Sequence, residues 1–448
     1  ASPGSTNISF IASLKHDKYF EIYSAPDERS AAYMACGLAA ESGDPVALSC
    51  TGATASRNYV PGLTEAFYRK LPILAITSTQ HMGQIDQYVP QVIDRTQMLN
   101  DIVNLSVQIP TIYDEMDAWS INTKINKALL ELRHKGGGPV HINITTSYPF
   151  HPIDFSTKKL PLTRAIYRFE YGEKFPQIEG KKNAIFVGNH SIMNEALIKE
   201  IELFCENYNG VVLCDHTSNY SGKYGISASL VTSQDSYTPA CINIDVLIHI
   251  GQVSGAYLKL NPNQVWRVNP DGVIRDTFRK LKYVFEVREV DFFKYYNEGS
   301  QNKTQNTFFD EWNKAYIHLN EKVKEEELPF SNIWIAQKTL DCIPQGSFLH
   351  LGILNSLRAW NFCHIRKDIN GFSNTGGFGI DGLMSSMLGS SLANKKKIHY
   401  QIIGDLAFFY DMNVLGNRHV SSNMRILLIN NGKGTEFRNY TNFASKFG

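Results

Sequence analysis

The sequence has almost no net charge and no cysteine pairing motif. Lys and Arg total 44 against 43 Asp and Glu, so no overall field attracts nucleic acid or an anionic membrane. The seven cysteines form no CxxC pair, which indicates reduced, buried thiols. No apolar stretch approaches the roughly 18 residues of a spanning helix, and no signal-peptide pattern opens the chain. We therefore expect a soluble, cytoplasmic, globular protein.

Short apolar runs alternate with helical patterns along the chain. The runs "PVALSC", "LPILAIT" and "GPVHINI" are bounded by Gly or Pro, which is typical of strands in a parallel α/β sheet. Similar sets recur after a Pro-rich and charged stretch near 150–180 and after a polar stretch at 296–328, which we interpret as a linker joined to a solvated helix. We expect three doubly wound α/β domains, comprising residues 1–152, 153–325 and 326–448.

Two neighbouring strand ends in the third set carry oxygen ligands. Asp405 follows the strand pattern "YQIIG", and Asn431 ends "RILLINN" 26 positions later. The carboxyl ends of parallel strands are where such sheets bind ligands, and carboxylate and amide oxygens suit Mg²⁺ that also holds phosphate. The alternative is that Asp405 caps a helix while the asparagine pair makes a turn, and the pattern alone leaves both open.

The segment "GFGIDG" at 377–382 spells G-x-G-x-x-G. A dinucleotide site would need a buried strand directly before it. The preceding residues, "HIRKDINGFSNTG", form no such strand, so we expect no nicotinamide site.

Taken together, these motifs resemble the thiamine diphosphate enzyme family. The matching segments are "DERSAAYMACGLA", "GPVHINI" and "GDL…NN", and "SPGS", "NPDG", "SNTGGFGIDG" and "IGDLAFFYDMN" are most similar to the menaquinone-pathway SEPHCHC synthase (MenD) branch. The resemblance implies pyrimidine-binding, central and diphosphate-binding domains, with thiamine diphosphate and Mg²⁺ as cofactors. It also implies a 2-oxo acid substrate, a carbonyl or alkene acceptor, and a homodimer or homotetramer with sites between chains.

The resemblance assigns the proton chemistry to Glu28. Burial raises the pKa of a carboxyl, so Glu28 would share a proton with N1′ of the cofactor's aminopyrimidine and favour the tautomer that removes the proton from thiazolium C2. The alternative is a helix N-terminal carboxylate stabilised by the macrodipole, a role that we expect for Asp27. Of the glutamines Gln84, Gln87 and Gln91, we assign Gln84 to the reacting carbon.

Further positions follow from the same resemblance. Residues expected to line the cofactor are Thr51, Gly52, Ser356, Phe378, Ile380, Gly404, Asp405, Leu406, Ala407 and Asn431. Residues expected to bind the metal are Asp405, Asn431 and, through its backbone carbonyl, Lys433. Ordinary core packing for Ile380 and a structural turn at 50–59 are the alternatives.

Arginines that the MenD branch uses for substrate carboxylates are replaced here. The candidate substrate positions are Ser5, Thr6, Trp360 and Thr375, and the last three stand where that branch carries Arg; its "DRP" is "STQ" at 78–80. We therefore predict a MenD-like decarboxylase or carboligase with an acceptor less anionic than isochorismate. The alternatives are a true SEPHCHC synthase and a non-catalytic protein of the same fold.

The chain also departs from the family at both ends. It begins at the turn "ASPGST", and it stops at "FASKFG" soon after the asparagine pair. The family pattern would place further elements beyond each end. We expect an incomplete diphosphate-binding domain, either because segments are missing from this sequence or because the protein is a trimmed variant.

Overall fold

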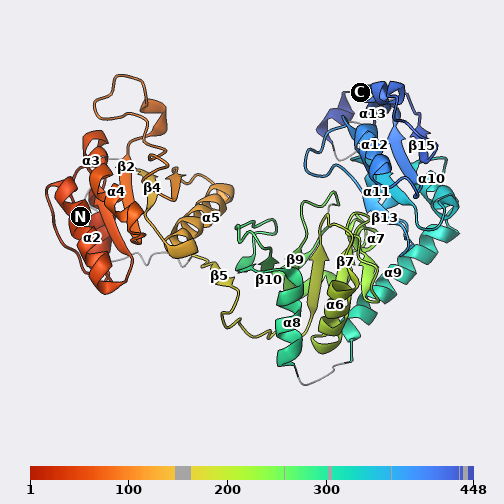
Figure 1. Ribbon diagram of the computed structural model, residues 1–448, viewed down its shortest axis with the longest axis horizontal. Coiled ribbons are helices and arrows are strands. Elements are labelled where there is room, and N and C mark those ends of the chain that lie inside the picture. Colours follow the sequence, from red (N-terminus) through yellow and green to blue (C-terminus); the bar gives the residue numbers. More distant parts are fainter. Residues whose placement is uncertain are drawn as a thin grey trace. The chain divides into compact units, whose positions relative to one another are not determined.

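The computed structural model describes residues 1–146, 163–256, 258–300, 305–364, 366–432, 434–436 and 442–447. They form two compact units, Ala1–Tyr167 and Arg168–Gly448 (Figure 1). Helices alternate with strands, and every pairing whose register is described is parallel. The predicted α/β class is confirmed. The three domain boundaries stay a prediction, and residues 147–162 of the expected linker lie outside the described residues.

The first unit is built on a four-stranded sheet of order β1-β2-β4-β3. Its strands are β1 (Val46–Cys50), β2 (Ile73–Thr79), β3 (Leu105–Ile109) and β4 (Val140–Thr145). Its helices are α1 (Ile8–His16), α2 (Glu28–Ser42), α3 (Ala53–Asn58), α4 (Val60–Tyr68) and α5 (Glu115–Glu131), with short turns η1 (Met82–Gln84) and η2 (His134–Gly136).

Helices cover both faces of this sheet because strand side chains alternate between the faces. Ile73 and Ala75 of β2 pack in one core with α2 and α4. Leu74, between them, packs in a second core with α5. Figure 1 shows α5 alongside β4. Such burial on both faces explains why the strands read as nearly continuous apolar runs.

The second unit contains a seven-stranded sheet of order β5-β11-β10-β9-β6-β7-β8. Its strands are β5 (Tyr167–Glu170), β6 (Asn183–Val187), β7 (Gly210–Cys214), β8 (Gly225–Ser227), β9 (Asn243–Ile250), β10 (Asn261–Val268) and β11 (Leu281–Glu286). The associated helices are α6 (Glu195–Asn207), α7 (Ala228–Thr232), η3 (Ala240–Ile242), α8 (Glu289–Gly299) and α9 (Thr307–Glu325).

Helix α9, in the segment that we expected to be solvated, is only partly exposed to solvent. Phe308 and Trp312 of α9 are fully buried, and the helix packs beside β7 and β8. The charged residues that dominate 307–325 occupy its outer face, which hid the apolar stripe at i, i+4 and i+7 spacing.

The same unit carries a second four-stranded sheet of order β13-β12-β14-β15. Its strands are β12 (Phe348–Leu351), β13 (Asn370–Phe372), β14 (His399–Gly404) and β15 (Met424–Ile429). Its helices are α10 (Asn332–Thr339), α11 (Asn355–Trp360), α12 (Leu383–Ala393) and α13 (Asp405–Tyr410), with turns η4 (Leu340–Cys342), η5 (Met412–Gly416) and η7 (Phe443–Lys446). One core contains α10 and α11, and the other contains α12 and α13.

Candidate functional site

The predicted oxygen ligands of the third sheet lie at neighbouring strand ends. Strands β14 and β15 pair in parallel, with Gly404 opposite Ile429, so Asp405 and Asn431 leave the same edge. Asp405 is buried, and its Oδ2 accepts a 2.6 Å hydrogen bond from the backbone N–H of Gly432. Its Oδ1 accepts from the N–H of Leu406 at 2.7 Å. The carboxylate therefore lies at the loop that carries Asn431, while Lys433 lies outside the described residues.

Glycines around this edge leave room for a ligand. A Cβ added to Gly404 or Gly432 would meet no atom within 4 Å, and the same holds for Gly376, Gly377 and Gly382. A hollow of about 520 Å³ is lined mainly by residues 373–382. At Gly404 and Gly432, which adjoin Asp405 and Asn431, the open backbone fits a diphosphate held through a divalent metal ion.

Helix α11 joins the end of β12 to the loop that follows β15. Asn355 Nδ2 donates to Thr435 Oγ1 at 2.7 Å, and Arg358 Nη1 contacts both carboxylate oxygens of Glu436 at 3.0 and 2.7 Å. Ser356, a predicted cofactor residue, is buried at the start of this helix. The N-cap of α11, Leu354, adopts a positive φ of 68°, which is an uncommon conformation for a branched residue.

The loop at 373–382 is hydrogen-bonded to a residue of the seven-stranded sheet region. Asn189, just after β6, donates through Nδ2 to Thr375 Oγ1 at 2.9 Å and to the carbonyl of Ser373 at 3.2 Å. Phe378 adopts a positive φ of 52°, and Ile380 packs against both cores of the third sheet. The position of Ile380 is thereby fixed by core packing, and its predicted support of the cofactor stays a prediction.

Three other predicted positions differ in exposure. Leu406 is half-exposed on α13, whereas Ala407 packs in the core. Trp360 is fully buried among apolar side chains. Its predicted contact with substrate stays a prediction, with the indole enclosed by protein in this chain.

The two acids at the start of α2 have different environments. Asp27 is the N-cap, and its carboxylate accepts from the N–H of Ser30 at 2.8 Å. This backbone hydrogen bond is the main cause of the lowered pKa of Asp27, and the expected capping role is confirmed. Glu28 is partly exposed and has no hydrogen bond or ion pair within the part of the chain that the structure describes. Burial raises the pKa of the nearby Cys50 thiol to about 12, and the charge of Glu28 adds to the rise.

The "SPGST" turn packs on the end of β1. Thr6 Oγ1 lies 2.5 Å from Thr51 Oγ1 and 2.7 Å from Ser78 Oγ, so these hydroxyls form a chain across β1 and β2. A Cβ on Gly4 would come within 2.3 Å of Thr51 Cγ2, so only glycine permits this approach. Ser5 is exposed beside them. Thr6 and Thr51 therefore contact each other, and the predicted substrate residue Thr6 is hydrogen-bonded within the protein.

The three glutamines of the loop after β2 are placed differently. Gln91 Oε1 would lie 2.2 Å from a Cβ on Gly52, so its amide sits against the predicted pyrimidine loop. Gln84, at the end of η1, has a buried Oε1 without a hydrogen-bond partner among the described residues. Gln87 is exposed. Gln84 stays the predicted residue, and Gln91, which the pattern could not single out, is a second candidate.

A ladder of polar side chains runs along the same sheet. Thr77 Oγ1 donates to Asn143 Oδ1 at 2.7 Å, so it accepts from His141 Nε2 at 2.8 Å. His141 Nδ1 then accepts from Ser106 Oγ at 2.6 Å. These bonds require the neutral ring with its proton on Nε2. Burial, together with the charge of Arg95, lowers the pKa of His141 to about 4.

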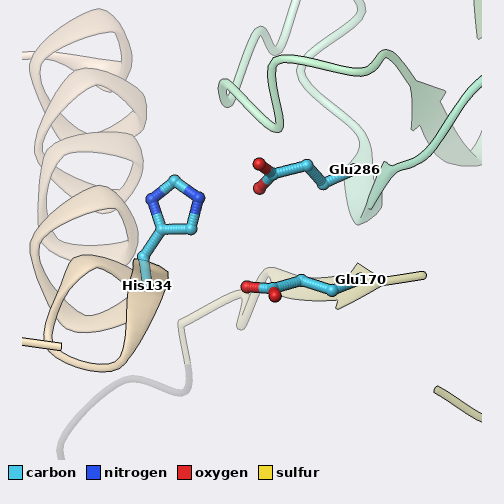
Figure 2. A group of neighbouring side chains, drawn as sticks. All are labelled: His134, Glu170 and Glu286. Atoms are coloured by element: carbon cyan, nitrogen blue, oxygen red, sulfur yellow. The ribbon is translucent and has the colours of Figure 1, made fainter. Parts of the chain in front are cut away.

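The second unit contains a pair of neighbouring carboxylates. Figure 2 shows Glu170 of β5 and Glu286 of β11, which come from neighbouring strands and point to the same side. The third residue drawn, His134, belongs to the first unit, where its Nδ1 is 3.1 Å from both carboxylate oxygens of Glu131. No third His, Cys or acidic side chain of the described second unit joins the pair, so we assign no metal there.

Comparisons with known proteins agree with the geometry. Residues 1–98 match the family described as thiamine pyrophosphate enzyme, N-terminal TPP binding domain. Relatives named 2-succinyl-5-enolpyruvyl-6-hydroxy-3-cyclohexene-1-carboxylate synthase from Bacteroides fragilis and Bacteroides thetaiotaomicron are 30% identical, over 97% of this chain and 80% of their own length. The one from Flavobacterium johnsoniae is 29% identical over 98% of this chain and 81% of its own.

Membrane spanning was also considered. Among the helices of the described residues, none combines the length and apolarity needed to cross a bilayer.

The polar ladder predicts how stability depends on pH. Because the pKa of His141 is about 4 when folded and about 6.5 when unfolded, the unfolded chain binds more protons between these values. The contribution is fully present above about pH 6.5 and is lost progressively as the pH falls toward about 4. We expect urea unfolding to show this loss and His141→Gln to flatten it. A histidine NMR signal from residue 141 titrating near pH 6.5 in the native protein would contradict the neutral ladder.

Proposed function

Because this chain belongs to the family of 2-succinyl-5-enolpyruvyl-6-hydroxy-3-cyclohexene-1-carboxylate synthase, a branch of the thiamine diphosphate enzymes, we propose that it decarboxylates 2-oxoglutarate and joins the succinyl fragment to isochorismate. It is a thiamine diphosphate enzyme, and its family works with a divalent metal ion, typically Mg²⁺. The near-full-length relatives favour this reaction over a different acceptor.

One observation of the structure supports the proposal most strongly. Asp405 and the Asn431–Gly432 loop meet at neighbouring strand ends, where the buried carboxylate accepts from Gly432 N–H. Glycine backbone leaves open space around them. A protein that had kept the fold and lost the chemistry would have no need for this ligand set, nor for the unpartnered Glu28 at the start of α2.

When bound, thiamine diphosphate supplies the electron sink that lets a 2-oxo acid lose CO₂. Glu28 would hold a proton shared with N1′ of the aminopyrimidine. Its carboxylate is available because Asp27 alone accepts the hydrogen bond from Ser30 N–H. Enclosure of Glu28 by the ligand would remove water from its carboxylate and favour proton sharing with the aminopyrimidine.

The diphosphate end is assigned to the second unit. Asp405 and the side-chain oxygen of Asn431 would hold the metal ion, with the carbonyl of Lys433 as a third protein ligand. Ser356 and the backbone of Gly404 would line the phosphates. Gln84 or Gln91 would donate to the substrate oxygen at the reacting carbon, and Gln91 has the support of its contact with the Gly52 backbone.

A second candidate function keeps the same chemistry with a less anionic acceptor. Its support comes from the positions where arginine is replaced. Thr6 is bonded to Thr51 and Ser78, Thr375 is bonded to Asn189, and Trp360 is buried. None of these side chains offers a charge to a substrate carboxylate.

We also propose that the active species is at least a homodimer. Helix α2 exposes the apolar side chains of Tyr33, Met34 and Leu38, and α13 exposes Leu406 and Phe409. Clustered exposed apolar residues beside a site are typical of surfaces that a partner covers. The resemblance implies that Glu28 of one chain and Asp405 of another complete each site.

The reaction itself provides the first test. Holoenzyme incubated with 2-oxoglutarate and isochorismate is expected to form the succinylated product, followed by mass spectrometry, together with CO₂. Glu28→Gln keeps the shape but cannot share the proton, and we expect turnover to fall by at least about 10²-fold. Asp27→Asn, which keeps the cap, should retain activity. If the enzyme released CO₂ without forming the ligation product, and an uncharged carbonyl acceptor restored ligation, the second candidate would be supported. Unchanged turnover of Glu28→Gln would refute its role.

Metal binding provides the second test. Asp405→Ala and Asn431→Ala should each weaken thiamine diphosphate and Mg²⁺ together, by at least about tenfold, because the metal joins protein to diphosphate. Titration calorimetry of each ligand in the presence of the other measures this coupling. Asp341→Ala, at an exposed position of the turn η4, serves as the control. Wild-type affinity in both variants would remove these residues from the site.

Sedimentation velocity tests the assembly. The wild-type chain should sediment as a dimer or larger, whereas Met34→Glu should shift the dimer dissociation constant by at least about 100-fold, since a carboxylate would be buried without a partner. Activity should fall in parallel. Tyr68→Glu alters a more exposed apolar residue at the end of α4 and should do neither. A monomer that retains full activity would contradict the proposal.

A further inference from the structure

Arg95 is a buried cation at the carboxyl edge of the first sheet. It lies in the loop between β2 and β3, and its residue is 7% exposed. Nη1 donates to the carbonyl oxygen of Thr51, the residue that follows β1, at 3.5 Å. Nε is buried and has no hydrogen-bond partner among the described residues. A guanidinium carries five N–H donors, so this long bond leaves most of its capacity unused.

No acid of the described chain neutralises Arg95. Within residues 1–146 and the other described ranges, no carboxylate lies within ion-pair distance of its guanidinium. The adjacent acid, Asp94, is turned toward Thr96, whose N–H and hydroxyl donate to Asp94 Oδ1 at 2.9 and 2.7 Å. A buried charge without a counterion is unfavourable, so the folded chain holds an unfilled requirement for an anion at this place.

The electrostatic surroundings strengthen that requirement. Burial lowers the pKa of Arg95, the neighbouring Cys50 raises it, and the charge of the exposed Arg57 lowers it. Arg57 thus adds a second positive charge to the same edge, although the protein as a whole is almost neutral. Positive potential concentrated in a partly enclosed site favours small anions.

The surroundings also place this cation in the proposed active site. Thr51, whose carbonyl accepts from Arg95, is bonded through its hydroxyl to Thr6. Gly52, the next residue, lies against the amide of Gln91. Arg95 therefore shares its immediate neighbours with the residues that face the reacting end of the cofactor in the proposed function.

We propose that Arg95 binds a carboxylate of the substrate and thereby determines specificity for carboxylate-bearing molecules. The inference rests on the proposed function and deepens it. Planar guanidinium and carboxylate groups pair through two parallel hydrogen bonds, and the unused donors of Arg95 provide such a fork. It supplies from the loop after β2 the positive charge that Thr6, Trp360 and Thr375 lack.

The test compares Arg95→Gln and Arg95→Lys with a control, Arg69→Gln. The control removes a surface arginine at the end of α4 that is paired with Glu65. Kinetics of the holoenzyme are measured with 2-oxoglutarate against 2-oxobutyrate, a donor without the distal carboxylate, and with isochorismate as the varied acceptor. Calorimetry with succinate and its monoamide, succinamate, reports carboxylate binding without turnover. Thermal unfolding identifies any variant that fails to fold. If Arg95→Gln is unstable, Arg95→Lys, which keeps the charge, is compared with wild type instead.

We expect Arg95→Gln to raise KM for one carboxylate-bearing substrate by roughly 10- to 100-fold, with kcat changed by less than about threefold. Arg95→Lys should recover part of the loss, and Arg69→Gln should match wild type. A rise confined to 2-oxoglutarate identifies the donor carboxylate, and a rise confined to isochorismate identifies the acceptor. Succinate should lose affinity while succinamate changes less.

The inference and the proposed function fail separately. If the wild-type enzyme makes no ligation product but succinate binding still depends on Arg95, the proposed substrates are wrong and the carboxylate site stands. If Arg95→Gln folds and leaves both KM values and succinate affinity unchanged, Arg95 only supports the Thr51 carbonyl and the inference is overturned.

Discussion

The parallel register of β14 and β15 is the constraint on which the diphosphate site depends. Because Gly404 lies opposite Ile429, both chains leave the sheet at the same edge, and the Asp405 carboxylate reaches Gly432 N–H at 2.6 Å. A slip of one residue would turn Asp405 to the other face of the sheet. Such a slip would also exchange buried and exposed side chains. The apolar cores on the two faces of this sheet therefore oppose it. Core packing thus determines where Asp405 lies relative to the loop that follows β15, and with it the position of the proposed metal ligands.

The sequence allowed the residues of this site to be predicted where local pattern determines their position. Asp405 and Asn431 follow apolar runs directly, so strand topology alone brings them together. Asp27 and Glu28 precede a small-residue helix, and their separate roles follow from capping geometry. The sequence pattern could not predict contacts between side chains that are far apart along the chain. Asn189 bonds to Thr375 across 186 positions, and nothing in either segment indicates that pairing.

Loops limited the prediction for a related reason. Gln84, Gln87 and Gln91 lie in one irregular segment without periodicity, so their directions depend on tertiary contacts that no spacing records. Gln91 and Arg95 reach the edge of the first sheet because that segment folds back over Thr51 and Gly52. The replaced arginines were visible in the sequence. The buried charge of Arg95 beside Thr51 was not, because an arginine in a polar loop is ordinarily solvated.

The proposed function divides the chemistry between the two units according to charge. In the second unit the Asp405 carboxylate lies at the loop that carries Asn431, whereas in the first unit Cys50 is acted on by the charges of Arg95 and of one acid, Glu28. That acid remains free because Asp27, beside it, satisfies the helix N-terminus through Ser30 N–H. Had Glu28 been the cap, its carboxylate would be held ionised by a backbone donor. In the proposed function the two adjacent acids therefore have distinct roles: Asp27 caps α2, and Glu28 faces the cofactor.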